Sequence, residues 1–174
     1  MRFRKFALYT AALLAAVPAL AQNPGQAAPT ALSEVYKDWT VNCANQDAKQ
    51  DCAFSQSQAN GNGQRILTIE VRPTEEGGLK GNLVLPFGLR LERGATFAVD
   101  DLPPGAPARF RTCLPIGCVV PLIFVDKTVK SLRDGKALKV VAVSNDGDKE
   151  IPFSISLQGF KEALDRTIAL TKPK

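Results

Sequence analysis

The four cysteines are the side chains of this sequence with the most reactive chemistry, and they form two closely spaced pairs. Eight residues separate Cys43 from Cys52, and four separate Cys113 from Cys118. Cysteines form disulfides, hold a metal ion as thiolates or react as thiols. Four cysteines allow three disulfide pairings, of which the sequence spacing favours Cys43 with Cys52 and Cys113 with Cys118.

Histidine is absent from the chain, and its absence excludes several classes of catalytic site. Ser-His-Asp and Cys-His nucleophilic sites, HExxH zinc sites and c-type haem attachment all require an imidazole. The sequence also lacks a Ser-x-x-Lys pair, a G-x-G-x-x-G motif and a phosphate-binding loop. We therefore expect no enzyme activity, no catalytic residues and no cofactor.

Neighbouring carboxylates are the other groups that could do chemistry, because two of them can act as general acid and general base. The sequence has three such sets: Glu75-Glu76, Asp100-Asp101 and Asp146 with Asp148. Each set lies beside or close to Gly or Pro, which are the residues that mark turns. We interpret these acids as turn residues.

The N-terminus favours disulfides over a metal site. Residues 1–21 combine a basic start, an apolar stretch and the small-x-small site Ala19-Leu20-Ala21, which is the pattern of a Sec-type signal peptide cleaved after Ala21. The apolar stretch is too short to span a membrane. An exported chain enters an oxidising compartment, and neither cysteine spacing is the C-x2-C type of many metal sites. We therefore expect two disulfides and no metal in a protein of the periplasm, of the cell surface or secreted.

Cleavage of the signal peptide also changes the net charge. Three of the 22 basic residues and none of the 17 acidic ones lie in residues 1–21, so the net charge falls from +5 to +2. The nearest approaches to a basic cluster are Arg90 with Arg93 and Arg109 with Arg111. Apolar residues are interleaved with both pairs, as on a solvated strand face. We expect no nucleic-acid partner and no transmembrane segment in the mature chain.

Three segments are predicted for the mature chain. Residues 22–36 begin with a small, polar, Pro-containing stretch, which is typical of a flexible linker. Residues 37–170 are predicted to form a single β-sandwich domain, and residues 171–174 a frayed tail.

The predicted domain is built from short strands. Apolar and polar residues alternate in segments such as 66–72 and 151–157, and Asn60-Gly61 predicts a tight hairpin turn. Cys118 to Val125 is the most apolar stretch of the mature chain and is predicted to be a buried strand. Helical periodicity is found only near residues 127–134 and from Phe160 onward. About eight or nine short strands with one or two short helices, one of them C-terminal, predict an all-β antiparallel sandwich.

Short motifs in a distinctive order extend from Asp38 to Leu164. They are Asp38-Trp39-x-Val41-x-Cys43, Cys52 followed by Gln56 and Gln58, Leu85-Pro86-x-Gly88-x-x-Leu91, Cys113 with Gly117-Cys118, and Ser156-Leu157-Gln158-Gly159-Phe160-x-x-Ala163-Leu164. In order and spacing these motifs resemble the invasion-associated locus B family of exported bacterial proteins. The resemblance implies an immunoglobulin-like β-sandwich in the periplasm or at the cell surface. It brings no catalytic residues, and it marks the four cysteines as structural.

Export, disulfides and the missing catalytic groups favour a non-enzymatic interaction protein of the invasion-associated locus B type. Its partner is expected to be an unidentified protein in the envelope or on a host cell. The alternative is a periplasmic envelope-maintenance or chaperone-like module that binds extended chains by strand addition. A small-molecule carrier with a pocket between sheets is a third hypothesis, and no sequence feature favours it.

The loop closed by Cys113 and Cys118 is the candidate interaction tip. Its apolar residues Leu114 and Ile116, together with Arg109 and Arg111 before it, are the side chains expected to face outward. In the competing interpretation, Leu114 and Ile116 fold back onto the core.

Overall fold

The computed structural model of the protein describes residues 31–46 and 49–171. The predicted signal peptide, the predicted linker up to residue 30 and the last three residues of the predicted tail lie outside the described residues. No helix within the described ranges is both long and apolar enough to cross a membrane.

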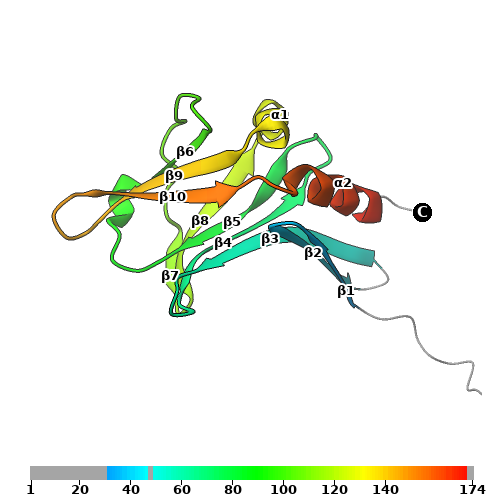
Figure 1. The fold of residues 1–174 in the computed structure, drawn as a ribbon, viewed down its shortest axis with the longest axis horizontal. Helices are drawn as coiled ribbons and strands as arrows, with labels where there is room; N and C mark the ends of the chain where they lie inside the picture. Colours follow the sequence, from blue (N-terminus) through cyan, green and yellow to red (C-terminus); the bar gives the residue numbers. More distant parts are fainter. Residues whose placement is uncertain (1–30, 47–48, 172–174) are drawn as a thin grey trace, which may run out of the picture.

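Two antiparallel sheets and two α-helices make up the described chain (Figure 1). The strands of the larger sheet are β1 (Ala31–Tyr36), β2 (Trp39–Gln46), β3 (Lys49–Ala59), β4 (Arg65–Pro73), β5 (Leu79–Leu85), β7 (Thr112–Leu114) and β8 (Gly117–Phe124). The smaller sheet contains β6 (Ala95–Val99), β9 (Ala137–Val143) and β10 (Glu150–Ser156). The helices are α1 (Asp126–Asp134), α2 (Phe160–Thr171) and the short 3-10 helix η1 (Leu91–Arg93).

Most neighbouring strands are also consecutive in the chain. The larger sheet has the order β1-β2-β3-β4-β5-β8-β7, and the smaller sheet has the order β10-β9-β6. After β5 the chain crosses to the smaller sheet for β6 and returns to the larger one for β7 and β8. The predicted all-β antiparallel fold with one or two short helices, including a C-terminal one, is confirmed, and the structure has two α-helices.

The hydrophobic core lies between the two sheets because one face of each central strand is apolar. In β4 the side chains of Leu67, Ile69 and Val71 are buried, while those between them are half-buried. In β9 the same alternation buries Leu138 and Val140. These residues belong to one continuous hydrophobic cluster. Each such side chain stabilises the fold by roughly 1.5–3 kcal/mol through burial.

Polar side chains of the larger sheet reach the edge of the smaller one. Gln56 on β3 donates a hydrogen bond to the carbonyl of Ser156 on β10 at 2.9 Å. Gln58 donates to the carbonyl of Ser154 at 2.8 Å. The indole Nε1 of Trp39 also donates to the Ser156 carbonyl, at 2.9 Å. Because β10 is an edge strand, these side chains satisfy main-chain carbonyls that face away from β9.

Helix α2 packs on β2 and β3 through three aromatic rings. Trp39, Phe54 and Phe160 are buried, and their ring centroids lie 5.2 to 5.4 Å apart. Tilted and edge-to-face contacts at this spacing are favourable beyond simple burial. Trp39 is therefore a residue of the core.

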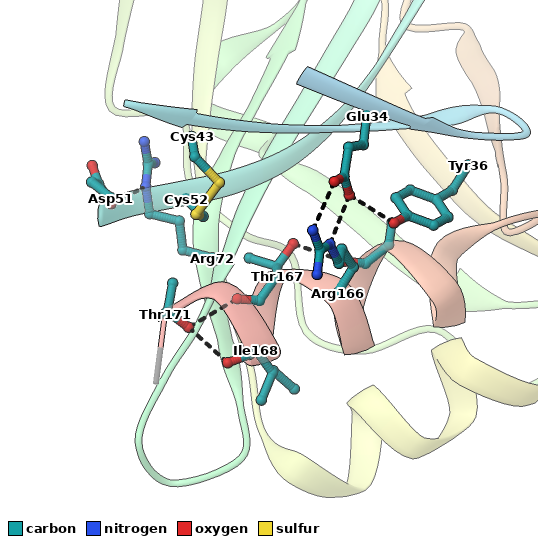
Figure 2. Close-up of a disulfide and its surroundings, with 11 residues drawn as sticks. Glu34, Tyr36, Cys43, Asp51, Cys52, Arg72, Arg166, Thr167, Ile168 and Thr171 are labelled. Carbon is teal, nitrogen blue, oxygen red and sulfur yellow. Dashed lines mark hydrogen bonds and ion pairs between the residues drawn. A yellow bond between two sulfur atoms is a disulfide. The ribbon is translucent and has the colours of Figure 1, made fainter. Parts of the chain in front are cut away.

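Strand β1 corrects the predicted linker boundary. Residues 31–36, assigned to the linker from their composition, pair with β2 along their whole length. Glu34 on β1 accepts two hydrogen bonds from Arg166 of α2, both at 2.8 Å, and a third from the Tyr36 hydroxyl (Figure 2). Arg166 lies 132 residues from Glu34 in the chain, so local composition cannot reveal this contact. At the other end, α2 includes Thr171, the first residue of the predicted tail.

Candidate interaction surface

Both disulfides join cysteines at directly opposite positions of neighbouring strands. Cys43 on β2 bonds to Cys52 on β3, and Cys113 on β7 bonds to Cys118 on β8. These are the two pairings that the spacing favours. The first disulfide is buried on the side of the larger sheet that faces α2 (Figure 2). The second is half open to solvent, because Cys113 is exposed and Cys118 is buried.

The second disulfide holds the β7–β8 hairpin, which lies at the lower end of the larger sheet in Figure 1. Pro115 and Ile116 make the turn between Leu114 and Gly117. Gly117 has φ +134°, and a Cβ there would collide with the carbonyl of Leu85 on β5. Glycine is therefore required for the hairpin to lie this close to its neighbouring strand.

All four predicted interaction residues are exposed. Leu114 is 46% and Ile116 57% exposed, so they do not fold back onto the core. Arg109 and Arg111 are exposed as well. The two apolar side chains lie at the turn of the hairpin, and the two arginines precede β7 in the chain. We use the name hairpin tip for Leu114, Pro115, Ile116 and Gly117.

Phe87 is an exposed aromatic residue that sequence reasoning did not select. It is 61% exposed and lies in the connection between β5 and η1. Because β5 ends at Leu85 directly opposite Cys118, this connection leaves the sheet beside the β7–β8 hairpin. Its place between Pro86 and Gly88 could have identified it, because Pro and Gly mark a turn, and a large apolar side chain in a turn is often exposed.

The outer edge of β8 is a second surface feature that sequence reasoning missed. β7 pairs only with Gly117 to Val119 at the start of β8. The carbonyl of Val119 accepts a hydrogen bond from Arg111 N at 2.8 Å, so the main chain of Val119 faces this edge. Main-chain groups of alternate residues face the same edge, which places those of Pro121 and Ile123 there too. Within the described ranges, no hydrogen bond reaches Pro121 or Ile123 from that side.

Strand β8 is therefore not buried throughout, as the stretch Cys118 to Val125 was predicted to be. Its core-facing side chains are buried, but Ile123 is 82% exposed, and Val125, directly after the strand, is 63% exposed. The prediction is wrong at this end because alternate side chains of β8 point to opposite faces, with Leu122 and Phe124 in the core and Ile123 on the outer face of the sheet. Pro121 fits such an edge, since its missing N–H leaves no ladder bond unmade.

A groove of about 450 Å³ lies between the outer edge of β8, strand β6 and helix α1. We call it the edge groove. Its apolar lining includes Phe97 of β6, Leu102 after β6 and Phe124 of β8, and the two Phe ring centroids are 6.3 Å apart. Helix α1 contributes the polar residues Lys127, Thr128 and Ser131. Lys127 is the sole charged residue in this lining.

The three sets of neighbouring acids lie in turns, as predicted. The carboxylate of Asp100 accepts hydrogen bonds from the main-chain N–H groups of Lys136 and Ala137, at 3.1 and 2.9 Å. Asp148 pairs with Arg90 at 2.6 Å. Asp100 and Asp148 therefore make structural contacts, and so does Arg90.

Comparison with known proteins shows that the chain matches one protein family. The model of the family described as "Invasion associated locus B (IalB) protein" matches residues 39–167, which span most of the described chain. The matched region includes all four cysteines, the hairpin tip and the outer edge of β8.

Relatives and a solved structure agree with this match. The chain is 40% identical over 166 residues to the invasion protein B homolog of Brucella abortus (strain 2308), covering 94% of each protein. It is 36% identical to Invasion protein B of Bartonella bacilliformis, covering 89% of this chain and 83% of that protein. The crystal structure of invasion associated protein b from Bartonella henselae superposes with a TM-score of 0.76 at 33% identity, covering 80% of this chain and 96% of that one.

Proposed function

We propose, from the premise that this chain belongs to the Invasion associated locus B (IalB) family, that it is an exported, non-enzymatic protein that acts through protein contacts at the cell envelope. The partner is a protein of the envelope or of a host cell. The names of the Brucella and Bartonella relatives connect those proteins with invasion, which supports the second kind of partner.

The observation that carries the proposal is the hairpin tip. Leu114 and Ile116 are exposed on a short hairpin that a disulfide closes at its base. Burying such a side chain completely against a partner contributes roughly 1.5–3 kcal/mol. A closed loop loses little conformational entropy on binding, so more of that free energy remains for affinity.

Two further features support the rest of the proposal. The chain has no histidine, and its four cysteines are joined in disulfides and cannot serve as nucleophiles while oxidised. The same two disulfides are the form that cysteines take in an oxidising compartment, which supports export.

The test is a pull-down from envelope extract with the mature protein as bait. Replacing both Leu114 and Ile116 with Ser removes the apolar surface of the hairpin tip. We expect recovery of the partner to fall by about tenfold or more, the effect of losing roughly 1.4 kcal/mol of binding free energy. Val35→Ser is the matched control, because Val35 is also exposed and lies on β1 at the opposite edge of the larger sheet.

The control should recover as much partner as wild type, and the tip variant should keep its free energy of unfolding. A destabilisation of about 2 kcal/mol or more would instead assign Leu114 and Ile116 to the core. Absence of any partner above background, or equal losses in tip variant and control, contradicts the proposal. The bait purified from the envelope should begin at Gln22, and a bait that retains residues 1–21 contradicts export.

The alternative function, a periplasmic chaperone-like module for extended chains, is favoured by a different observation. The outer edge of β8 presents main-chain groups that have no strand of the described residues beside them, next to an apolar groove. An unpaired edge of this kind is where an extended chain adds to a sheet. Suppression of aggregation of reduced α-lactalbumin tests this function, and a protein that leaves the aggregation unchanged contradicts it.

A further inference from the structure

We infer that the edge groove binds an extended peptide, which adds to β8 as a further strand and places a carboxylate beside Lys127. This inference deepens the alternative function stated above and rests on it.

Main-chain groups provide the first part of the recognition. On the outer edge of β8, the N–H and carbonyl of Ile123 and the carbonyl of Pro121 have no main-chain partner among residues 31–46 and 49–171. A β-strand partner satisfies donors and acceptors in this alternating arrangement, whereas a compact small molecule rarely does. The edge is accessible because residues from Pro121 to Phe124 line the edge groove.

The walls of the groove provide the second part. Successive side chains of an added strand point to opposite faces, so every second one would enter the space between the sheets. That space is bounded by Phe97, Leu102 and Phe124, and its volume of about 450 Å³ can hold two or three apolar side chains. The groove therefore selects a peptide with apolar residues at alternate positions.

Charge provides the third part. Lys127 is exposed in the groove, and no carboxylate of the described residues lies within salt-bridge distance of it. On the other side of Ile123 the charges are different, because three carboxylates (Glu75, Glu76 and Asp126) and one cation (Lys80) line a separate hollow, which leaves an excess of negative charge there. A carboxylate on the peptide is therefore attracted to the groove side and repelled by the other.

The test uses a fluorescently labelled peptide with alternating Thr and Val residues and one terminal Asp, titrated with the mature protein. We expect saturable binding, and about tenfold weaker binding when Asn replaces the Asp, since a charge-assisted contact contributes on the order of 1.5 kcal/mol. The Asn peptide keeps the shape and main-chain groups, so the comparison isolates the charge.

Two variants locate the site. Ile123→Pro removes the one free N–H donor of this edge without removing a hydrogen bond of the sheet, so the protein should fold and lose binding by tenfold or more. Lys127→Glu should weaken binding of the Asp peptide and strengthen binding of the same peptide with a terminal Lys. Lys161→Glu is the control, because it makes the same charge change at an exposed position of α2 and should leave both affinities unchanged.

The outcomes separate the inference from the function on which it rests. If wild type and Ile123→Pro suppress α-lactalbumin aggregation equally and neither binds the peptide, the chaperone-like function stands and this site is wrong. If wild type neither suppresses aggregation nor binds peptide, both are wrong. If wild type is a dimer that Ile123→Pro converts to a monomer, with no peptide binding, the edge is an interface between two copies and the inference is overturned.

Discussion

Glu34 is the side chain whose protonation is most closely tied to the fold. Hydrogen bonds from Arg166, and then from the Tyr36 hydroxyl, lower the pKa of Glu34 from its ordinary 4.5 to about 2. The same network raises the pKa of Tyr36 above its ordinary value. Glu34 therefore binds a proton less readily in the folded state than in the unfolded state, and protonation works against the contact between β1 and α2.

This difference predicts how stability depends on pH. The contribution of Glu34 to the free energy of unfolding is complete above about pH 4.5 and is lost as the pH falls from 4.5 through 2. Glu34→Gln should be less stable than wild type at pH 7, and the difference should be smaller at pH 3. Urea unfolding of both proteins at the two pH values measures it. A difference that is equal at pH 7 and pH 3 would contradict a contribution from the charge of Glu34.

At the scale of elements, the β7–β8 hairpin depends on its disulfide more than on its strands. β7 has three residues, and Cys113 lies in the middle of them. So short a strand holds few ladder bonds, while a closed loop of about six residues restricts the unfolded chain by roughly 2 kcal/mol in the chain-entropy account. The disulfide thus both stabilises the fold and fixes the position of the hairpin tip.

Replacing Cys113 and Cys118 together with Ser tests this dependence. We expect the free energy of unfolding to fall by roughly 2 kcal/mol, and recovery of the partner in the pull-down to fall as well, because Leu114 and Ile116 are no longer held together. The matched variant replaces Cys43 and Cys52, which lie away from the hairpin. It should lose stability, but among molecules that remain folded it should recover the partner normally. If the variant without Cys113 and Cys118 recovers as much partner as wild type, the disulfide is not needed to hold the hairpin tip in position.

Elements that are defined by contacts between residues close in the sequence could be predicted, and elements that depend on contacts between distant residues could not. The hairpin of β7 and β8 could be predicted because its cysteines lie five positions apart and the Gly lies between them. The outer edge of β8 could not, since it depends on where β7 stops. The position of β1 could not be predicted either, because an arginine near the other end of the chain holds it.

For the whole molecule, the alternation of apolar and polar residues predicted the class of fold. It did not predict which strands belong to which of the two sheets. Alternation shows which side chains of β4 or β9 face inward, because it depends on neighbouring residues only. The transfer of β6 to the smaller sheet, and the bonds from Gln56 and Gln58 to β10, depend on tertiary packing. The edge groove arises from the same division of strands, so it had no local signal.

The two exposed surfaces lie at the two ends of β8 and have different chemistry. The hairpin tip at the start of β8 is a small apolar contact on a closed loop, and the edge groove farther along combines free main-chain groups with one cation. The first suits a folded protein surface and the second an extended chain. A measurement in living cells that compares positions on one molecule can therefore test the proposed function directly.

That measurement is site-specific photo-crosslinking in native cells, with a photoreactive amino acid in place of Ile116 and, in a second strain, in place of Val35. The proposed function predicts that an envelope protein, or a host-cell protein during contact, is captured from position 116 and not from position 35. Equal capture from both positions, or capture from neither, contradicts the claim that this protein acts through its hairpin tip.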